Sequence, residues 1–355
     1  MPVAFTLRPW PATLGLALLL AAGPALLHAK DVPEPVAVAA DFDAAGQAGA
    51  LLKVSEAPLL KGLRRVAVPQ FSVQFITADS ATAETSGFAA AGRARVTASY
   101  RLQGVAEPEF QAMTEALYAE FLQALAASGL EVLPLAQVTA APSYAKLAAS
   151  GVSTPVREDS SITVAPQGLA LYGTHRAMAM APGKNAGVFG ALSGFSSVAS
   201  AIGSIGDVQA LCQELGDAAL LEVHMVVNFV ELTNNNRGFF GRISSTASVG
   251  AKAAPSVGKA TLGVQVGAMR GSLELTRALA LDASAFSTVR EQAKSTGEKA
   301  GAVAVAVLAF AIGSKDSSSS SAMEAVADPA RYREVVGGGL GQVGKMFVAR
   351  LQSER

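Results

Sequence analysis

The stretch Arg64-Arg-Val-Ala-Val-Pro-Gln-Phe-Ser-Val-Gln-Phe-Ile76 gives the clearest indication of the fold. Its β-branched and aromatic residues are typical of a strand. Pro69 has no backbone N–H with which to bond a neighbouring strand, so we expect a bulge or a sheet edge at this residue. The segment predicts that the chain builds a β-sheet.

Residues 93–104 predict a second strand, because polar and apolar residues alternate strictly along them. Such alternation is typical of an antiparallel strand with one face in water. A helix is predicted at 108–127, since Pro108 suits a first helical turn and apolar residues recur at helical spacing. Gly129 suits the position just after the helix end. The order strand, strand, helix indicates an α/β protein.

Further elements follow along the chain. We predict strands at 130–133, 220–232, 243–253, 260–268 and 273–281, and helices at 143–149 and at 207–215 behind an Asp207 cap. The Gly-, Ala- and Ser-rich segment 186–206 predicts a helix within an insertion at 151–206. Residues 301–313 carry no charge and indicate a buried helix, with contact to a bilayer as the alternative. A closing helix is predicted by an apolar stripe at Tyr332, Val336, Leu340, Val343, Phe347 and Leu351.

Together these elements predict an α/β fold that leans toward α+β. We expect a single, antiparallel-rich mixed sheet with packed helices and a Gly/Ala-rich helical insertion. The chain divides into a signal peptide at 1–29, a flexible lead at 30–61 and an α/β domain at 62–355. Within that domain, the Ser-rich segment 315–321 has the composition of a flexible linker.

Composition limits the classes of function. The chain has 355 residues, 28 Lys+Arg against 28 Asp+Glu, and a hydrophobic share of 50%. This composition supports a folded core, and the charge balance argues against nucleic-acid binding. Arg8, an apolar run at 14–22 and small residues up to Ala29 have the layout of a secretory signal peptide. The alternative is an uncleaved anchor, although the apolar run is short for a membrane span.

Cys212 is the only cysteine, so no intramolecular disulfide can form. It lies on the apolar face of a predicted helix, which is typical of an inert buried thiol. No cysteine stands at the end of the signal segment to carry a lipid. We therefore expect a bacterial periplasmic protein that is not a lipoprotein.

Two histidines follow the signal segment, at His175 and His224. His224 shares a strand face with Glu222 and Asn228, and this polar face is the best candidate binding surface. A solvated sheet face explains the same pattern. Because no third catalytic partner can be named, we expect no catalysis at these residues.

The sequence also contains residue types that bind soft metals: His175 with Met178 and Met180, and Met225 beside His224. Zinc and copper sites normally show denser ligand spacing, and Met is a common filler of gaps in protein cores. We therefore expect neither a metal nor another cofactor.

Residues 339–344 fit the pattern GxGxxG. Nucleotide sites with this pattern need a preceding strand and a continuing α/β unit, whereas here only eleven residues follow Gly344 and Leu340, Val343 and Phe347 belong to the helical stripe. The glycines therefore predict a helix face that packs closely on a sheet.

Three segments carry a resemblance to a known architecture: Arg65-Val-Ala-Val-Pro-Gln-Phe71, Gly129-Leu-Glu-Val-Leu-Pro134 and Gly216-Asp-Ala-Ala-Leu-Leu-Glu-Val223. With the helices between them, the order resembles the periplasmic α/β domain shared by the curli-transport lipoprotein family and the amino-terminal domain of the TolB family. The resemblance covers residues 62–150 and 207–355. It implies a non-enzymatic envelope protein that works by contacts with other proteins. The chain lacks a lipid-anchor cysteine and a pair of amphipathic pore hairpins, so a secretion-channel role is not expected.

The sequence thus predicts an exported periplasmic protein, without catalysis, that binds or assembles other envelope proteins. One alternative is a periplasmic hydrolase or metal-binding protein that uses His175 or His224. Another is a membrane-associated oligomer. Peripheral membrane contact and homo-oligomerisation stay open, and nucleic acid is not expected as a partner.

Overall fold

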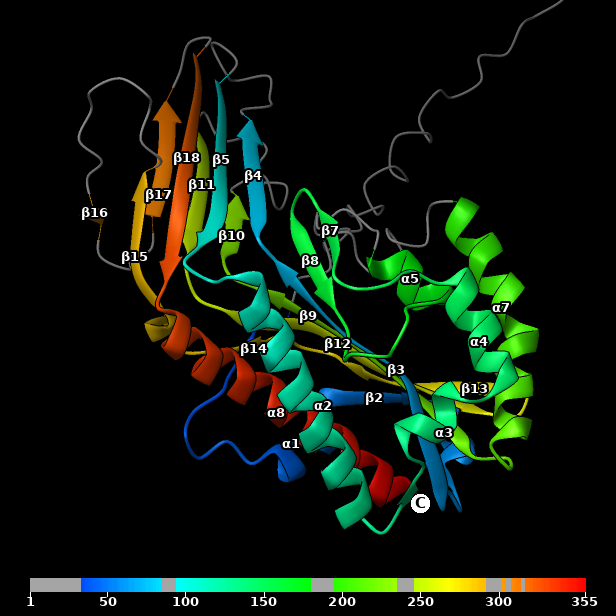
Figure 1. The fold of residues 1–355 in the computed structure, drawn as a ribbon. Helices are drawn as coiled ribbons and strands as arrows, with labels where there is room; N and C mark the ends of the chain where they lie inside the picture. The colour runs from blue at the N-terminus through cyan, green and yellow to red at the C-terminus, as the bar shows by residue number, and fades with distance from the viewer. Residues whose placement is uncertain are drawn as a thin grey trace, which may run out of the picture. The chain divides into compact units, whose positions relative to one another are not determined.

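The computed structural model describes residues 33–84, 94–179, 195–234, 246–291, 302–303, 308–313 and 317–355 (Figure 1). The fold is of the mixed α/β class, as the sequence predicts. The prediction of a single sheet is wrong, because the strands form a ten-stranded, a five-stranded and a three-stranded sheet.

The main sheet contains both parallel and antiparallel pairs. Its strands are β1 (Val36–Ala37), β2 (Leu52–Ser55), β3 (Arg65–Ile76), β6 (Glu131–Val132), β7 (Val156–Glu158), β8 (Ser161–Val164), β9 (Ala219–Asn228), β12 (Ser256–Val266), β13 (Met269–Leu275) and β14 (Leu279–Ala280). In its centre, β3 runs parallel to β9 and antiparallel to β8, and β9 runs antiparallel to β12.

Strand β3 confirms the predicted strand and its irregularity at Pro69. Every residue of β3 after Arg65 is buried, so both faces of this strand are covered. The pairing of β3 with β9 is interrupted between Ala67 and Gln70, on either side of Pro69. The missing N–H of Pro69 is thus accommodated by a bulge inside the sheet rather than by an edge.

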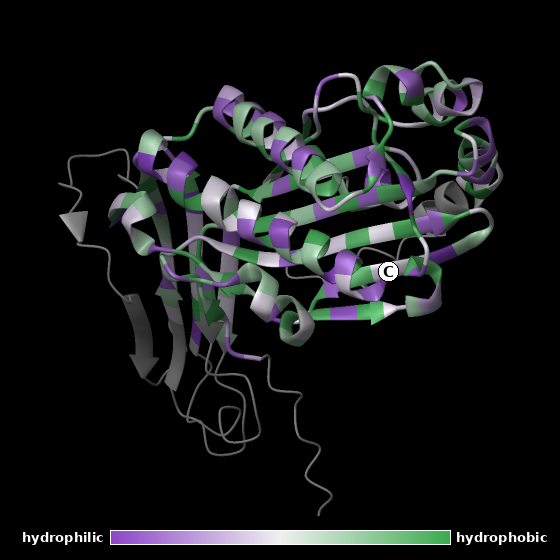
Figure 2. Cartoon of the chain, turned by 90° about the horizontal axis from the view of Figure 1, so that it is seen from below, coloured by the Kyte–Doolittle hydropathy of each residue, from purple (hydrophilic) through white to green (hydrophobic). Residues whose placement is uncertain are grey.

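Helices α2 (Glu107–Ala127) and α8 (Pro329–Glu354) lie side by side on one face of the main sheet, with α1 (Ala44–Leu51) next to α8 (Figure 1). The aromatic side chains of β3 pack under them: Phe75 stacks on Phe110 with ring centroids 4.4 Å apart, and Phe71 contacts Tyr118 edge-on at 5.3 Å. All six residues of the stripe predicted for the closing helix are buried. Figure 2 views the main sheet from this helix-covered side.

The flexible lead predicted at 30–61 is wrong for residues 33–61. They form β1, α1, β2 and the 3-10 helix η1 (Ala57–Leu60). Asp43 caps α1 by accepting a hydrogen bond from the Gly46 N–H at 3.0 Å, and Ala44 and Ala48 are buried. The alanine-rich composition that suggests flexibility instead allows α1 to pack closely against α8.

The other face of the main sheet carries α4 (Pro142–Ser150), α5 (Gly173–Ala179) and α7 (Phe195–Glu214), with α3 (Leu135–Thr139) before them. The separate helix predicted at 207–215 is wrong: Asp207 lies inside α7, so it is not an N-cap. The insertion predicted at 151–206 is helical only in part, because β7 and β8 lie within it and β8 pairs with β3. Of the helix predicted at 186–206, residues 195–206 are helical and 186–194 lie outside the described residues.

Two smaller sheets lie against each other beside the main sheet. The five-stranded sheet contains β4 (Ala78–Glu84), β5 (Ala94–Gln103), β15 (Phe286–Glu291), β16 (Ala302–Val303) and β18 (Ser317–Ala327); the three-stranded sheet contains β10 (Glu231–Asn234), β11 (Thr246–Lys252) and β17 (Leu308–Gly313). Strand β11 contacts both β4 and β5. Strands β5 and β18 are parallel, and each leads directly into a long helix, α2 or α8.

Two sequence predictions fail in these smaller sheets. The buried helix predicted at 301–313 is wrong, because 302–303 and 308–313 are strands. The alternation of Ala with Val or larger residues has the period of a strand, and low charge alone does not specify a helix. The flexible linker predicted at 315–321 is wrong for 317–321, because these serines pair in register with residues 94–98 of β5.

The glycine pattern at 339–344 lies inside α8. Its backbone N–H groups therefore serve the helix and are not presented to a phosphate. Gly339 faces Leu281, and a Cβ at this position would lie 2.4 Å from the Leu281 Cδ2 atom. The structure confirms the predicted close-packing helix face.

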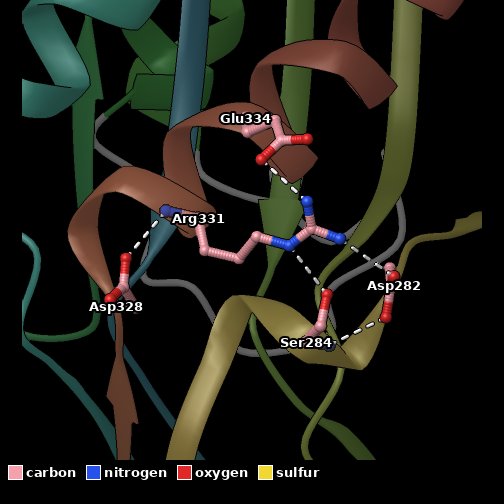
Figure 3. Close-up of polar contacts among 5 residues, drawn as sticks. All are labelled: Asp282, Ser284, Asp328, Arg331 and Glu334. Atoms are coloured by element: carbon pink, nitrogen blue, oxygen red, sulfur yellow. Dashed lines mark hydrogen bonds and ion pairs between the residues drawn. The ribbon is translucent and has the colours of Figure 1, made fainter.

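The start of α8 is fastened to the short 3-10 helix η3 (Ala283–Ala285), as Figure 3 shows. Asp328 accepts a hydrogen bond from the Arg331 N–H at 2.9 Å and so caps the helix. The Arg331 guanidinium donates to Ser284 at 3.0 Å and pairs with Glu334 at 2.7 Å. These contacts fix the corner at which β18 turns into α8.

Candidate functional site

The candidate site is a group of polar side chains on one face of β3 and β9. Residues 70, 72 and 74 of β3 point away from the aromatic residues that face α2, because successive side chains of a strand alternate between faces. Gln70 pairs in register with Glu222, and Ser72 pairs with His224. His175 reaches this face from α5. We call Gln70, Ser72, His175, Glu222 and His224 the polar layer.

The polar layer is sealed from water. Ser72 is 0% exposed, Glu222 is 3% exposed and His224 is 5% exposed. The expectation of a solvated face around Glu222 and His224 is therefore wrong, because α5 and α7 cover this side of the sheet. Asn228 is only partly buried and pairs in register with Ser256. It lies four residues beyond His224, about 13 Å along the strand, so it is not part of the layer.

Ser72 joins the two histidines that the sequence analysis considered separately. The Ser72 Oγ atom lies 2.9 Å from His224 Nδ1 and 3.4 Å from His175 Nδ1. The two rings meet edge-on, with centroids 5.8 Å apart. A hydroxyl carries one proton, so only one ring can accept from Ser72, and the other must donate its own Nδ1–H. The two imidazoles are thus held neutral in opposite tautomers.

Burial keeps both histidines neutral. It lowers the pKa of His175 to about 3, and the charge of Arg270 acts in the same direction. It also lowers the pKa of His224 to about 3, with further lowering by His175 and Lys259. Because the charged form is disfavoured by desolvation and by neighbouring cations, neither ring carries a proton charge at neutral pH.

Glu222 is the buried acid of the layer, and it is neutralised across an intervening strand. Arg270 of β13 donates to the Glu222 Oε2 atom at 2.6 Å. The bridge passes Gly263 of β12, where a Cβ would lie 3.4 Å from the arginine nitrogen and 3.5 Å from the carboxylate oxygen. Gln70 donates to the other carboxylate oxygen at 3.5 Å and accepts from the Tyr172 N–H at 3.2 Å. The ion pair therefore passes within van der Waals distance of the Gly263 backbone.

The layer has some of the groups of a serine hydrolase, but it lacks access. A nucleophilic serine must reach a substrate carbonyl, and the Ser72 side chain lies on a buried strand with no exposed surface. The second partner of Ser72 is another histidine rather than a carboxylate that would orient His224. In this closed arrangement, the hydroxyl and the two rings form a cohesive hydrogen-bonded group.

The candidate metal ligands His175, Met178 and Met180 are described only in part. Among the described residues, no group of three or more His, Cys, Asp or Glu side chains is placed to hold a metal ion. His175 belongs to the polar layer, Met178 is partly exposed, and Met180 lies outside the described residues. Arg270 and Lys259 both disfavour positive charge at the histidines, so the local electrostatics also oppose a cation.

Cys212 is buried in α7, as predicted. Burial is the main cause that raises the pKa of its thiol to about 11, so the reactive thiolate is disfavoured. In the described part of the chain, no helix is both long and apolar enough to cross a bilayer.

A shallow depression of about 340 Å³ lies apart from the polar layer, lined in part by Gln111, Thr154 and Gln167. Two of its polar groups are engaged within the protein: Gln111 donates to the Ala165 carbonyl at 3.0 Å, and the Gln167 N–H donates to Glu115 at 2.7 Å. It offers no charged side chain for a ligand among its lining residues.

The sequence analysis missed Gln70, Ser72 and Arg270. Polar residues at every second position of β3, Gln70, Ser72 and Gln74, were the available signal, because a buried strand is normally apolar throughout. No protein-family model, no curated protein and no solved structure matches the chain. The resemblance to the curli-transport and TolB-like architecture stays a prediction from the sequence.

Proposed function

We propose that the chain is an exported periplasmic protein without catalytic activity that binds other proteins of the cell envelope. The observation that carries this proposal is the sealed polar layer. Its hydroxyl, its two imidazoles and its carboxylate bond to one another or to Arg270, and Ser72, His175 and His224 are almost wholly buried. Residues with catalytic chemistry thus stabilise the fold, and recognition must use the outer surface. The signal-like segment at 1–29 supports export.

The outer side of the five-stranded sheet is the surface that we assign to protein contact. Small hydroxyl side chains project from three neighbouring strands, and we call them the hydroxyl face: Ser80, Thr82, Thr97, Ser99, Ser318 and Ser320. In the alternating positions of β5, Val96, Ala98 and Tyr100 are buried, so the hydroxyl residues must point outward. Thr82 and Thr97 share a hydrogen bond of 3.0 Å.

Charged residues border the hydroxyl face. Arg95 and Arg101 are exposed on the same side of β5. Arg101 pairs in register with Glu324, which bonds to Arg290 at 2.9 Å. A flat surface of short side chains loses little conformational entropy when it is covered. It lacks the large apolar core of an obligate interface, so it suits a polar, water-containing and reversible contact.

The proposal is tested in cells of a bacterial host. Fractionation should recover a processed chain in the periplasm. A photo-crosslinking amino acid at Ser99 or Ser320 should give adducts with other proteins, and the same group at Lys345, exposed on α8, serves as the control. Recovery of unprocessed chain from the cytosol would sink the export claim. Equal adducts at all three positions, or none at the two serines, would contradict the assignment of the hydroxyl face to protein contact.

One observation keeps a hydrolase as the second candidate, namely the 2.9 Å contact between Ser72 and His224. Ser72→Ala removes the only hydroxyl that this pair could use as a nucleophile while it keeps both histidines. A binding protein should retain its crosslinks and its cellular effect in this variant. Loss of the cellular effect in a folded variant with intact crosslinks would favour the hydrolase.

A further inference from the structure

We propose that Ser72, His175 and His224 form an acid-sensitive latch that holds α5 on the main sheet at neutral pH and releases it when the medium is acidified. The latch is independent of the proposed binding function, because it concerns only how α5 is attached to the sheet.

The attachment of α5 to the sheet depends on few side chains, whereas most of its packing is against α7. The helix spans Gly173–Ala179, and its buried residues are Gly173, His175 and Ala179. His175 is the one of these with a polar side chain, and it contacts Ser72 of β3. Arg176 donates to the Ser150 carbonyl at the end of α4. The side-chain polar link from α5 to β3 therefore runs through one imidazole, and a backbone link lies just before the helix, where the Tyr172 N–H donates to Gln70.

Protonation breaks the hydrogen-bond arrangement of the latch. At neutral pH, one ring accepts the Ser72 proton and the other donates to the Ser72 oxygen. A protonated imidazole has a hydrogen on both nitrogens, so the accepting ring can no longer take the hydroxyl proton. The Ser72 oxygen can accept from both Nδ1–H groups, but its own hydroxyl proton then has no acceptor on either ring, and a positive charge lies 5.8 Å from the second ring.

The surrounding charged groups do not relieve this charge. Lys259 of β12 and Arg270 of β13 are cations on the same face as His224. The Glu222 carboxylate is already paired with Arg270 at 2.6 Å. Glu274 of β13 is exposed, accepts a hydrogen bond from Ser272 and lies beside Lys53 of β2 in the sheet register. On the side of the sheet that α5 and α7 cover, burial raises the pKa of Tyr172 and Cys212, so both side chains remain neutral. Exposure to water is thus the available way to stabilise a protonated His175.

The linkage between protonation of His175 and release of α5 gives the size of the pH effect. In the released state His175 takes the ordinary histidine pKa of about 6.5, whereas in the closed state it stays unprotonated well below that pH. The equilibrium for opening should therefore increase about tenfold for each pH unit below 6.5, or about 30-fold at pH 5.0 for one histidine. Elements whose packing does not include the latch should not share this increase.

Hydrogen exchange of the full chain at pH 7.5 and pH 5.0, corrected for intrinsic exchange rates, tests the latch. We expect amides of α5 to lose about 30-fold in protection at pH 5.0, while amides of α2 and α8 whose exchange is independent of low urea concentrations, and therefore local, keep theirs. The matched variant is His175→Asn with His224→Asn, because the Asn side chain places a polar atom near the Nδ1 position and does not titrate. Its α5 should show the same protection at both pH values.

Three results would overturn the latch. They are unchanged protection of α5 in the wild-type chain, an equal loss of protection at the locally exchanging amides of α2 and α8, and the same acid effect in the double variant. If the double variant does not fold, the wild-type series still decides between local release and the first two results.

Discussion

Replacing Arg270 with methionine should destabilise the protein far more than the same change at Arg290. The two arginines are matched in exposure, at 48% and 50% of the side chain, and each forms one ion pair, at 2.6 Å and 2.9 Å. Their partners differ: the Glu222 side chain is 3% exposed, whereas that of Glu324 is 14% exposed. Methionine keeps most of the apolar stem, so the change removes the charge and little packing.

The expected loss in unfolding free energy follows from the hydrogen bonds and neighbouring charges that each carboxylate retains after the substitution. Without Arg270, Glu222 retains only the 3.5 Å bond from Gln70 and stays buried. Breaking a buried pair costs about 3–5 kcal/mol, and the half-exposed arginine lowers this to about 2–3 kcal/mol because water already screens one side of the pair. Without Arg290, Glu324 still lies beside Arg101 in the sheet register. Exposed pairs of that kind contribute about 0–1 kcal/mol.

Urea unfolding followed by circular dichroism measures both variants, with the slope of the transition checked for two-state behaviour. Adding Glu222→Gln to Arg270→Met should recover at least half of the loss, because the buried charge is removed together with its partner. If the two single variants lie within about 0.5 kcal/mol of each other, a typical range for neutral surface changes, burial of Glu222 does not control the energetics of the polar layer.

Three further outcomes are expected. Gly338→Ala should stabilise the chain by up to about 1 kcal/mol, because nothing lies near its Cβ position in α8. Gly339→Ala should be destabilising, because its Cβ would lie 2.4 Å from Leu281. Thermal melts of the two variants measure the difference in stability. Gly104→Ala should lose at least about 1–2 kcal/mol, because Gly104 has a φ of +87° and its Cβ would meet the Ala327 carbonyl oxygen; a normal urea midpoint in this variant would contradict the observed turn. Stability should fall as the pH drops below about 6.5, because the pKa values of His175 and His224 are about 3 in the folded chain and the unfolded chain binds protons first. The loss is about 2 kcal/mol for each histidine at pH 5.0, above the range in which the carboxylates titrate, and unfolding of the double asparagine variant should lack it.

Local periodicity predicted the elements that depend on their own residues. The strands at β3 and β5 and the helices α2, α4 and α8 have a clear period or terminal signals, and the structure contains each of them. The elements at 33–61 and β17 were missed because packing overrides intrinsic preference there: alanine favours helices and glycine favours neither helix nor strand, yet the conformation is set by the neighbour that each segment packs against or pairs with. The serine-rich start of β18 is a strand because β5 supplies its hydrogen-bond partners.

The polar layer was only half predictable for a different reason. Glu222 and His224 were recognised as a polar pair within one strand, and both were assigned to water. Their burial depends on α5 and α7, and their partners on β3, Gln70 for Glu222 and Ser72 for His224, each lie 152 residues away in the sequence. A strand pattern shows which residues share a face, but it does not show which distant strand pairs with it or what covers that face.

The layer also explains how a strand buried on both faces keeps its register. A one-residue slip of β3 against β9 would turn Gln70, Ser72 and Gln74 toward the aromatic residues of α2 and would leave His224 and Glu222 opposite apolar side chains. Each unpaired buried polar group costs about 1–3 kcal/mol, so several lost at once would exceed a large part of the stability of a typical domain. A fully apolar β3 would lack this penalty. The polar residues thus make one pairing, and one choice of helix layer for each face, much more stable than its nearest alternative.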